Sequence, residues 1–237
     1  MSSKHQELAG FIWSVADLLR GDFKQSEYGK VVLPFTVLRR LDCVLAPTKP
    51  KVLDRAAKLA QQGIQNVDPL LCKAAGLSFY NTSGFPDLAA VVADADNVAK
   101  NLRAYLGGFS ANAQEIFQRY DFNTQVQRLD EADLLYRVLG KFAAVDLGPG
   151  DVSNEDMGYA FEELIRKFSE ISNETAGEHF TPREVIRLMV NLLLDPDEPE
   201  LITPGAVRTV LDPACGTGGM LTAAEEFITT HNPDATV

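Results

Sequence analysis

The chain has 237 residues, of which 46% are hydrophobic and 23% charged, and its formal net charge is −11. That length suffices for one large domain or two modest ones, and the composition is ordinary for a globular protein. No apolar run approaches the roughly 20 residues that a membrane helix needs. The first residues, MSSKHQELAG, lack the basic-then-apolar profile of a signal peptide. We therefore expect a cytoplasmic protein that does not enter a membrane.

The cysteines and histidines do not suggest a disulfide framework or a metal site. Three cysteines and three histidines are scattered along the chain, and no two cysteines form a CxxC pair. They are Cys43, Cys72, Cys215, His5, His179 and His231. We expect a chain without bound metal.

The acidic balance bears on whether the chain could hold nucleic acid. A protein that binds DNA without a partner usually presents a basic face, whereas the net negative charge of this chain repels phosphate groups. Arg20, Arg39 and Arg40 could touch a phosphate backbone, although arginines of this kind more often pair with nearby acids or stay solvated. If the chain works on DNA, we expect another subunit to supply much of the grip.

Helical periodicity dominates residues 6–145. Apolar residues recur at helical spacing from Leu8 to Leu19, and Gly21 follows as a stop. A second apolar helix covers 31–45, where Pro34 either opens the helix late or kinks it. Further helices are expected over 51–62, 69–75, 87–106, 112–120 and 131–145, with an extended, turn-rich segment at 77–86. These patterns predict a helical N-terminal domain over residues 1–147.

A break at LGPGD, residues 147–151, separates this region from a second one, because two glycines and a proline fall within five residues. The first element expected after the break is a helix over 155–171, with Ser153 or Asn154 as its N-cap. A loop over 173–180, a helix over 182–194 and a polar connection over 195–205 follow. The last elements expected are a buried strand over 206–212, a glycine-rich turn and a helix over 220–230. This order is the opening of an α/β fold, with one confident strand. We therefore expect residues 151–237 to be the incomplete beginning of an α/β domain.

The sharpest motif is VLDPACGTGGML, residues 210–221. Glycines after a strand allow a tight turn and a close approach of a ligand to the main chain. No lysine is present for a phosphate-binding P-loop, and Leu221 occupies the third glycine position of a dinucleotide fingerprint. Asp212 would repel a pyrophosphate but suits the cationic amine and sulfonium of S-adenosylmethionine. The alternative is a tight strand-to-helix turn that binds nothing.

The second motif is AGEHFTPREV, residues 176–185. It has the pattern of a helix start, with Thr181 as N-cap, Pro182 in the first helical position and Glu184 completing a capping box. Taken alone, this pattern needs no ligand.

Together these residues resemble a known family. LDPACGTGGML is similar to the S-adenosylmethionine loop of adenine-N6 DNA methyltransferases. The N-terminal segments ELAGFIWSVADLLRG and YGKVVLPFTVLRRLDCVL resemble the helical domain of the modification (methyltransferase) subunits of type I restriction–modification systems. In that family an aromatic-Thr-Pro segment packs over the methionine end of the cofactor. Phe180, Thr181 and Pro182 match it, while His179 stands where an aromatic residue is more usual.

The resemblance implies a fold, a cofactor and a site. The fold is a mostly α N-terminal helical domain followed by the truncated start of an α/β Rossmann-like S-adenosylmethionine-dependent methyltransferase domain. The cofactor-binding residues implied are Glu178, His179, Phe180, Thr181, Pro182, Arg183, Asp212, Pro213, Ala214, Gly216, Thr217, Gly218 and Gly219.

No catalytic residue is expected in this chain. Amino-methyltransferases of this class hold the target amine with an (Asn/Asp)-Pro-Pro-aromatic motif, which in the family follows the glycine loop. None of the four Asx-Pro pairs here extends to that motif. The pairs are Asp68–Pro69, Asp195–Pro196, Asp212–Pro213 and Asn232–Pro233.

The function implied is that of the parent protein, which would transfer a methyl group from S-adenosylmethionine to adenine N6 in DNA. Its partners would be a specificity subunit, a restriction subunit and, in the assembled complex, double-stranded DNA. Two alternatives remain open: a methyltransferase that acts on RNA or protein, and a non-enzymatic helical module that docks a partner.

Overall fold

The computed structural model describes residues 3–172, 181–195, 201, 203–215 and 218–237. Contacts between Cα atoms divide the chain into two compact units, Met1–Phe168 and Ser169–Val237. In the described part of the chain, every helix is too short or too polar to cross a bilayer.

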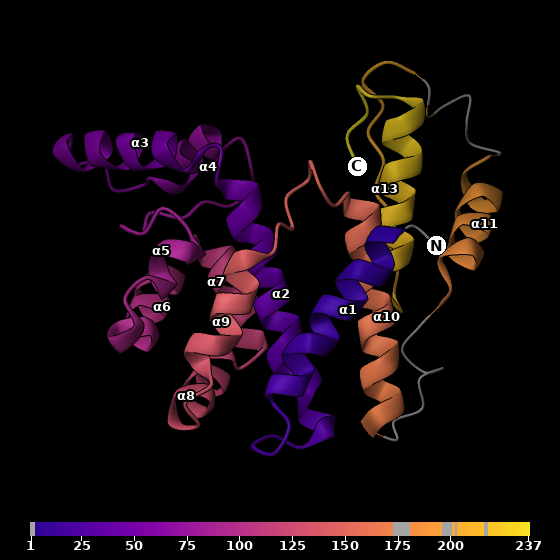
Figure 1. The fold of residues 1–237 in the computed structure, drawn as a ribbon. Helices are drawn as coiled ribbons and strands as arrows, with labels where there is room; N and C mark the ends of the chain where they lie inside the picture. Colours follow the sequence, from indigo (N-terminus) through magenta and orange to yellow (C-terminus); the bar gives the residue numbers. More distant parts are fainter. Residues whose placement is uncertain (1–2, 173–180, 196–200, 202, 216–217) are drawn as a thin grey trace. The chain divides into compact units, whose positions relative to one another are not determined.

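The first unit is built of helices joined by short connections (Figure 1). Its helices are α1 (Ser3–Leu18), α2 (Tyr28–Leu45), α3 (Lys49–Gln61), α4 (Asp68–Ala75), α5 (Leu88–Val92), α6 (Val98–Gly107), α7 (Ala111–Arg119), α8 (Phe122–Glu131), α9 (Leu135–Ala144) and most of α10 (Asn154–Ser172). The helical N-terminal region expected from the sequence is therefore present. Because α2 begins at Tyr28, Pro34 lies inside that helix and does not open it.

An aromatic cluster forms the centre of the first unit. Phe35 of α2 is fully buried and meets Phe122 of α8 edge-on, with ring centroids 4.7 Å apart. It also stacks on Phe142 of α9 at 5.5 Å, and Phe142 in turn meets Phe11 of α1 edge-on at 5.3 Å. Such ring pairs add roughly 0.5–1.5 kcal/mol each beyond their buried area. Aromatic rings from α1, α2, α8 and α9 thus form one connected cluster, in which Phe35 of α2 contacts the rings from α8 and α9.

Two helix predictions in this unit were wrong. The helix expected over 87–106 is divided into α5 and α6 by a 3-10 turn, Ala95–Asn97. The Asn97 side chain donates to Asp94 at 3.0 Å, a local bond of the kind that favours turns over helix. The helix expected over 131–145 starts only at Leu135, because Asp133 adopts a left-handed conformation with φ 54°.

Helix α8 was missed entirely. Its sequence, FNTQVQRLDE, is mostly polar, which hid a short apolar stripe. Phe122, Val126 and Leu129 recur at positions i, i+4 and i+7, and all three are buried. That spacing is the signal from which the helix could have been predicted.

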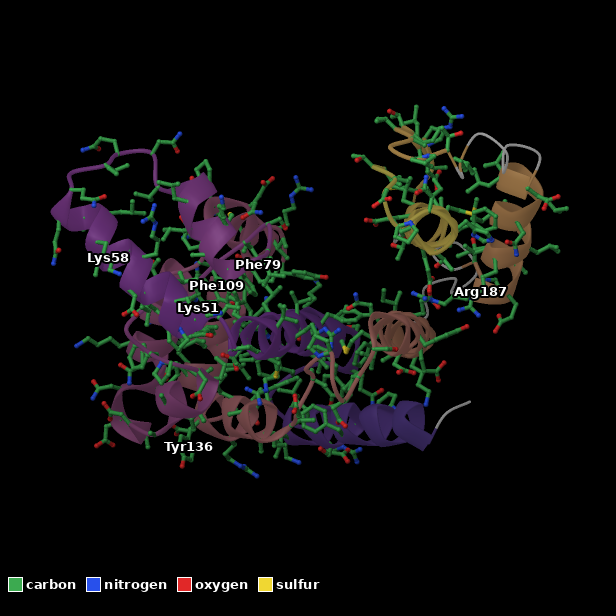
Figure 2. All side chains as sticks on the ribbon, turned by 90° about the horizontal axis from the view of Figure 1, so that it is seen from above. Lys51, Lys58, Phe79, Phe109, Tyr136 and Arg187 are labelled. Atoms are coloured by element: carbon green, nitrogen blue, oxygen red, sulfur yellow. The ribbon has the colours of Figure 1, made fainter. Side chains whose placement is uncertain are left out.

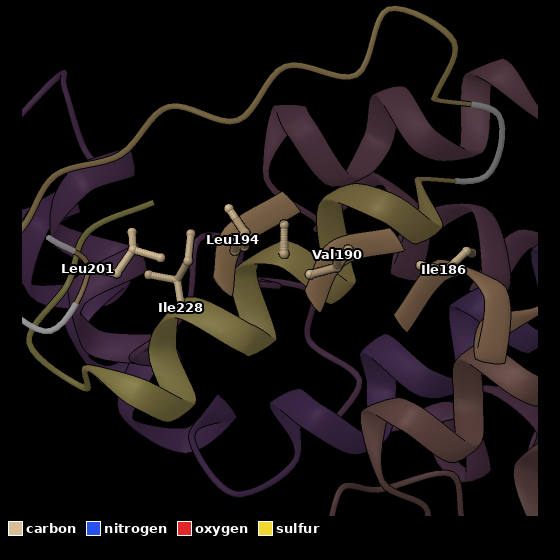
Figure 3. Packing of buried hydrophobic residues seen from close by; sticks show 6 residues of the cluster. Ile186, Val190, Leu194, Leu201 and Ile228 are labelled. Atoms are coloured by element: carbon tan, nitrogen blue, oxygen red, sulfur yellow. The ribbon is translucent and has the colours of Figure 1, made fainter. Parts of the chain in front are cut away.

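The second unit is held together by two helices that run side by side, α11 (Arg183–Leu194) and α13 (Gly219–His231). Six buried residues form its core (Figure 3), and Val210 and Met220 pack against them. The six are Ile186, Val190, Leu194, Leu201, Ala224 and Ile228.

The strand expected over 206–212 is not formed as a ladder. Among the described residues, Val207 makes a single parallel bridge to Thr236, through the backbone of Ala206 and Arg208, and 209–212 pair with no neighbouring strand. A strand needs partners for its backbone groups, and in the described part of this unit only Thr236 provides one. The described residues of this unit therefore form helices beside one extended segment without an assembled sheet, and the α/β order stays a prediction.

A buried lysine links three parts of the first unit. The Lys49 side chain at the start of α3 is only 3% exposed. Its Nζ donates to Asn81 Oδ1 and Ser83 Oγ, both at 3.0 Å, and lies 4.4 Å from the centroid of the Tyr105 ring. Burial lowers the pKa of Lys49 to about 8. The loop at 77–86 is thereby fastened to both α3 and α6.

The same polar cluster continues into α2 through Tyr105. The Tyr105 hydroxyl donates to Asp42 Oδ1 at 2.6 Å, and Arg39 donates to Asp42 Oδ2 at 2.5 Å. Burial raises the pKa of Asp42, although both hydrogen-bond donors favour its ionised form. Each buried charge in the cluster is therefore matched by hydrogen-bonding partners, as interior charges need to be.

The burial of Lys49 predicts a pH-dependent stability. A free lysine titrates at 10.5, whereas the folded pKa is about 8. Between these values the unfolded chain binds more protons than the folded one, so the contribution of Lys49 to the free energy of unfolding rises with pH. We expect the stability of the wild type relative to Lys49→Met to increase by about 1–3 kcal/mol from pH 8 to pH 10, since one pKa unit corresponds to about 1.4 kcal/mol.

Urea denaturation at several pH values measures this difference. Lys58→Met is the matched control, because Lys58 lies on the same helix but is exposed. A stability difference between the wild type and Lys49→Met that stays constant with pH would contradict the burial argument.

Candidate functional site

The glycine loop leaves the extended segment at Asp212 and enters α13 at Gly219. Asp212 Oδ1 accepts a hydrogen bond from the Ala214 backbone N–H at 3.0 Å, which closes the first turn. The Gly218 N–H then donates to the Cys215 carbonyl at 2.7 Å. Pro213 and Ala214 are exposed, whereas Gly216 and Thr217 lie outside the described residues.

Gly218 is the N-cap of α13 and has a left-handed backbone, with φ 82°. A side chain at this position would be strained, which explains a glycine here. Gly218 itself has no side chain that could cap the helix. The first amides of α13 therefore offer donors, and the positive end of the helix dipole, to whatever lies beside the loop.

Gly219 allows α11 and α13 to approach closely. A Cβ at Gly219 would lie 2.7 Å from Cδ1 of Ile186, closer than real Cβ contacts come. Ile186 lies one turn into α11, and Gly219 is the first residue of α13. The two helices run in the same direction (Figure 1), so their N-terminal ends lie at the same end of the unit. The described residues just before the two helices, Thr181 and Pro182 for α11 and Gly218 for α13, therefore lie at the same end of the unit.

The helix start at the second motif differs from the prediction. Pro182, not Thr181, is the N-cap of α11, and no side chain caps this end. Pro182 has an extended ψ of 138°, and its carbonyl accepts from the amides of Val185 and Ile186, both at 3.0 Å. The helix therefore begins one residue later than expected, at Arg183, which moves Glu184 out of the third helical position. The predicted capping box was wrong.

The other predicted residues of this motif are placed as follows. Thr181 and Pro182 are exposed ahead of α11, and Arg183 is half-buried in its first turn. Glu178, His179 and Phe180 lie outside the described residues. Of the thirteen predicted cofactor residues, the described ones thus fall on the approach to α11 and on the loop before α13.

The arginines considered for DNA contact are already engaged. Arg20 pairs with Asp17 at 2.8 Å, and Arg39 is bound to Asp42. Arg40 donates to the carbonyls of Leu147 and Val152, the latter at 2.7 Å, and to Asn154 Oδ1 at 2.6 Å. The expectation that such arginines pair with nearby acids is confirmed for Arg20 and Arg39, whereas Arg40 binds carbonyl and amide oxygens instead.

A groove of about 260 Å³ lies elsewhere between α11 and α13. It is lined by Arg187 (labelled in Figure 2), Val190, Asn191, Ala223, Glu226, Phe227, Thr230 and His231. Phe227 and His231 stack there with ring centroids 4.3 Å apart. The groove follows the middle of α11 and the later turns of α13, so it is separate from the glycine loop.

Comparison with known proteins defines the class of protein. Residues 8–142 match the HsdM N-terminal domain, and residues 152–236 match the N-6 DNA methylase family. The first match covers more than half of the chain. The chain therefore belongs to the HsdM family, the methylase subunits of type I restriction–modification systems, and the resemblance found in the sequence is confirmed.

Individual relatives are similar over different lengths. The methylase subunit of the type I restriction enzyme MjaIX from Methanocaldococcus jannaschii is 26% identical over 231 residues, which are 93% of this chain and 39% of that protein. The EcoEI methylase subunit from Escherichia coli is 29% identical over 152 residues, 64% of this chain and 26% of that protein. The HindI methylase subunit from Haemophilus influenzae is 32% identical over 87 residues, 37% of this chain and 16% of that protein. The chain thus spans about two fifths or less of the length of these relatives.

The left-handed backbone of Gly218 predicts a specific order of mutant stabilities. Gly218→Ala should destabilise the start of α13 by roughly 1–2 kcal/mol, the cost of a left-handed residue with a Cβ. Gly218→Asn should cost less, because asparagine tolerates this conformation. Hydrogen exchange of the α13 amides measures both variants, and equal protection in Gly218→Ala and the wild type would show that the loop does not require this backbone.

Proposed function

We propose that the modification subunit carrying this chain transfers a methyl group from S-adenosylmethionine to N6 of adenine in DNA. The observation that carries the proposal is the loop from Asp212 to Gly218, which leads into the uncapped start of α13 within a region that matches N-6 DNA methylases. That match also favours DNA over RNA or protein as the substrate.

We propose further that the second unit opens a Rossmann-like fold. The parallel bridge of Val207 and Thr236 supports this, with the Arg208 amide donating to Thr236 O at 3.0 Å and the Thr236 amide donating to Ala206 O at 2.9 Å. Two parallel segments joined through α13 form the start of a strand–helix–strand crossover. Sequence reasoning did not identify the second of these segments, at 235–237.

The bare apolar surfaces of the second unit support the same fold. Val210 packs against the core, whereas Val207 and Leu211 on the opposite side are 68% and 85% exposed. Helix α11 also exposes a stripe of apolar residues, namely Val185, Leu188, Met189, Leu192 and Leu193. Strands of a parallel sheet are normally covered on both faces. We infer that further strands and helices of the methyltransferase domain cover these surfaces.

The cofactor would bind where the two motifs converge. The Asp212 carboxylate keeps Oδ2 without a partner among the described residues, because Ala214 uses Oδ1. This charge suits a cationic ligand, and Gly218 leaves the main chain open beside it. Asp212, Pro213, Ala214, Gly216, Thr217, Gly218 and Gly219 would form one wall; Glu178, His179, Phe180, Thr181, Pro182 and Arg183 would form the cover. When bound, the cofactor supplies a methyl group on a sulfonium, and the protein's task is to hold it in line with the amine.

The family and the net charge of the chain both support a proposal about its partners. We propose that a specificity subunit chooses the DNA sequence, that a restriction subunit can join the complex, and that the complex works in the cytoplasm. The net charge of −11 supports a division of labour in which another subunit supplies much of the DNA grip. The target adenine would have to leave the duplex to reach the site.

Asp212 should matter for cofactor affinity in the full-length subunit. Hydrogen bonds to charged groups contribute about 1.5–3 kcal/mol, so Asp212→Ala should weaken S-adenosylmethionine binding by about 10- to 100-fold. Titration calorimetry measures the change. The matched control is Asp195→Ala, at the exposed far end of α11. Unchanged affinity in Asp212→Ala would refute this assignment of the wall.

The 237-residue chain alone should not methylate DNA, because its sequence contains no (Asn/Asp)-Pro-Pro-aromatic motif. Labelled cofactor and mixed-sequence DNA, with and without a specificity subunit, provide the assay. Label incorporated above background in either sample would overturn this expectation.

A further inference from the structure

Helix α3 carries basic residues along one side. Lys51, Arg55 and Lys58 follow each other at positions i, i+4 and i+7, a spacing that places them on one helix face. We call them the α3 basic stripe. Lys51 and Lys58, labelled in Figure 2, are exposed, and Arg55 is half-buried. The other side of the helix is anchored by Val52 and Leu59, both fully buried. The stripe therefore faces outward from a fixed helix.

The charge around this helix is opposite to that of the chain. Residues 47–76, which include α3 and α4, contain four basic residues besides the buried Lys49 and two acidic ones, whereas the whole chain has a net charge of −11. Helices α3 and α4 pack on each other at one end of the first unit (Figure 1). Positive charge is thus concentrated at one end of a unit that belongs to an acidic protein.

Four arginines of the first unit have partners within the protein, whereas the described residues show no partner for the side chains of the stripe. Arg39 and Arg40 are engaged in hydrogen bonds, and Arg119 and Arg128 form ion pairs with carboxylates at 2.6 and 3.0 Å. Within the described residues the stripe forms no ion pair, even though Asp54 lies on the same helix. Its charges are available to a ligand outside the unit.

We propose that the α3 basic stripe contacts the phosphate backbone of double-stranded DNA. The proposal rests on the proposed function, which makes DNA the substrate. Lys51 and Lys58 are separated by about 10 Å along the helix axis at 1.5 Å per residue. Measured along the duplex axis, each DNA strand has about one phosphate per 3.4 Å, so about three fall within that length. Contacts of this kind position a duplex without reading its sequence, which suits a subunit whose target is chosen elsewhere.

The test compares two triple variants that lose the same charge. The first is Lys51→Ala/Arg55→Ala/Lys58→Ala. The second, the control, is Lys30→Ala/Lys100→Ala/Arg137→Ala, which removes three exposed basic residues from α2, α6 and α9. Each is titrated with a short duplex of arbitrary sequence, binding is followed by fluorescence anisotropy across a salt series, and amide shifts of the 237-residue wild type are mapped by NMR.

In the wild type, we expect shifts centred on 49–61. Each phosphate contact contributes about 0.9 to the magnitude of the slope of log K against log salt concentration. For the stripe variant we therefore expect the magnitude of this slope to fall by about 2–3. We also expect its DNA affinity at low salt to fall by at least about tenfold. The control should lose far less. Thermal denaturation checks that both variants remain folded.

Three outcomes would overturn the proposal: no DNA-induced shifts, shifts confined to other helices, or equal losses in the two variants. A salt-sensitive self-association that only the stripe variant loses, without DNA-induced shifts, would instead assign α3 to an acidic protein surface and also overturn it. Cofactor titration of the full-length subunit distinguishes a failure of this inference from a failure of the proposed function. If the cofactor binds but DNA does not contact α3, this inference alone fails; if DNA contacts α3 and no cofactor binds, the proposed function fails.

Discussion

The contact between Ile186 and Gly219 sets the geometry of the second unit. Because Gly219 has no side chain, the first turn of α13 can lie directly against α11. Every later contact of the pair, from Val190 to Ile228, follows from that starting point, since the two helices run in the same direction. A larger residue at 219 would force the Ile186 side chain or the start of one helix to shift, at the end of the unit where the proposed cofactor site lies.

The first unit depends on polar contacts in its interior as well as on its aromatic centre. Lys49 and Asp42 are charged groups inside the protein, and each is surrounded by specific partners. Removing one partner from such a cluster costs more than the cluster contributes as a whole, because a desolvated group is left unmatched. The loop at 77–86, which has little regular structure, is held by this cluster and by backbone hydrogen bonds to Gly108 and Ser110.

Some features of this organisation were predictable from the sequence, and others were not. The helical character of the first unit and the glycine at the start of α13 were predictable, because apolar spacing and glycine act locally. Helix α8 was hidden by polar residues whose exposure depends on tertiary packing. The capping box failed because Thr-Pro-Arg-Glu allows two starts one residue apart, and the extended ψ of Pro182 decides between them. The burial of Lys49 had no sequence signal at all, since its partners Asn81 and Ser83 are more than thirty residues away.

The strand at 206–212 shows a different limit. Its residues have strand character, but a ladder is a property of neighbours, and the sequence of one segment does not supply them. The proposed cofactor wall begins at the end of this segment, at Asp212. The shape of this proposed wall therefore depends more on the strands that would pair with 206–212 than on the loop that follows Asp212.

The side chain of Arg40 has a mechanical consequence for the segment at 147–152. This glycine- and proline-containing connection looks in sequence like a free joint, yet the guanidinium of α2 holds the carbonyls at both of its ends and the first residue of α10. Charge-assisted hydrogen bonds contribute about 1.5–3 kcal/mol each. To pivot at this joint, the chain would have to release all three together. The beginning of α10 is therefore rigidly connected to α2. A displacement of α10 would be transmitted through α2 to the aromatic centre around Phe35.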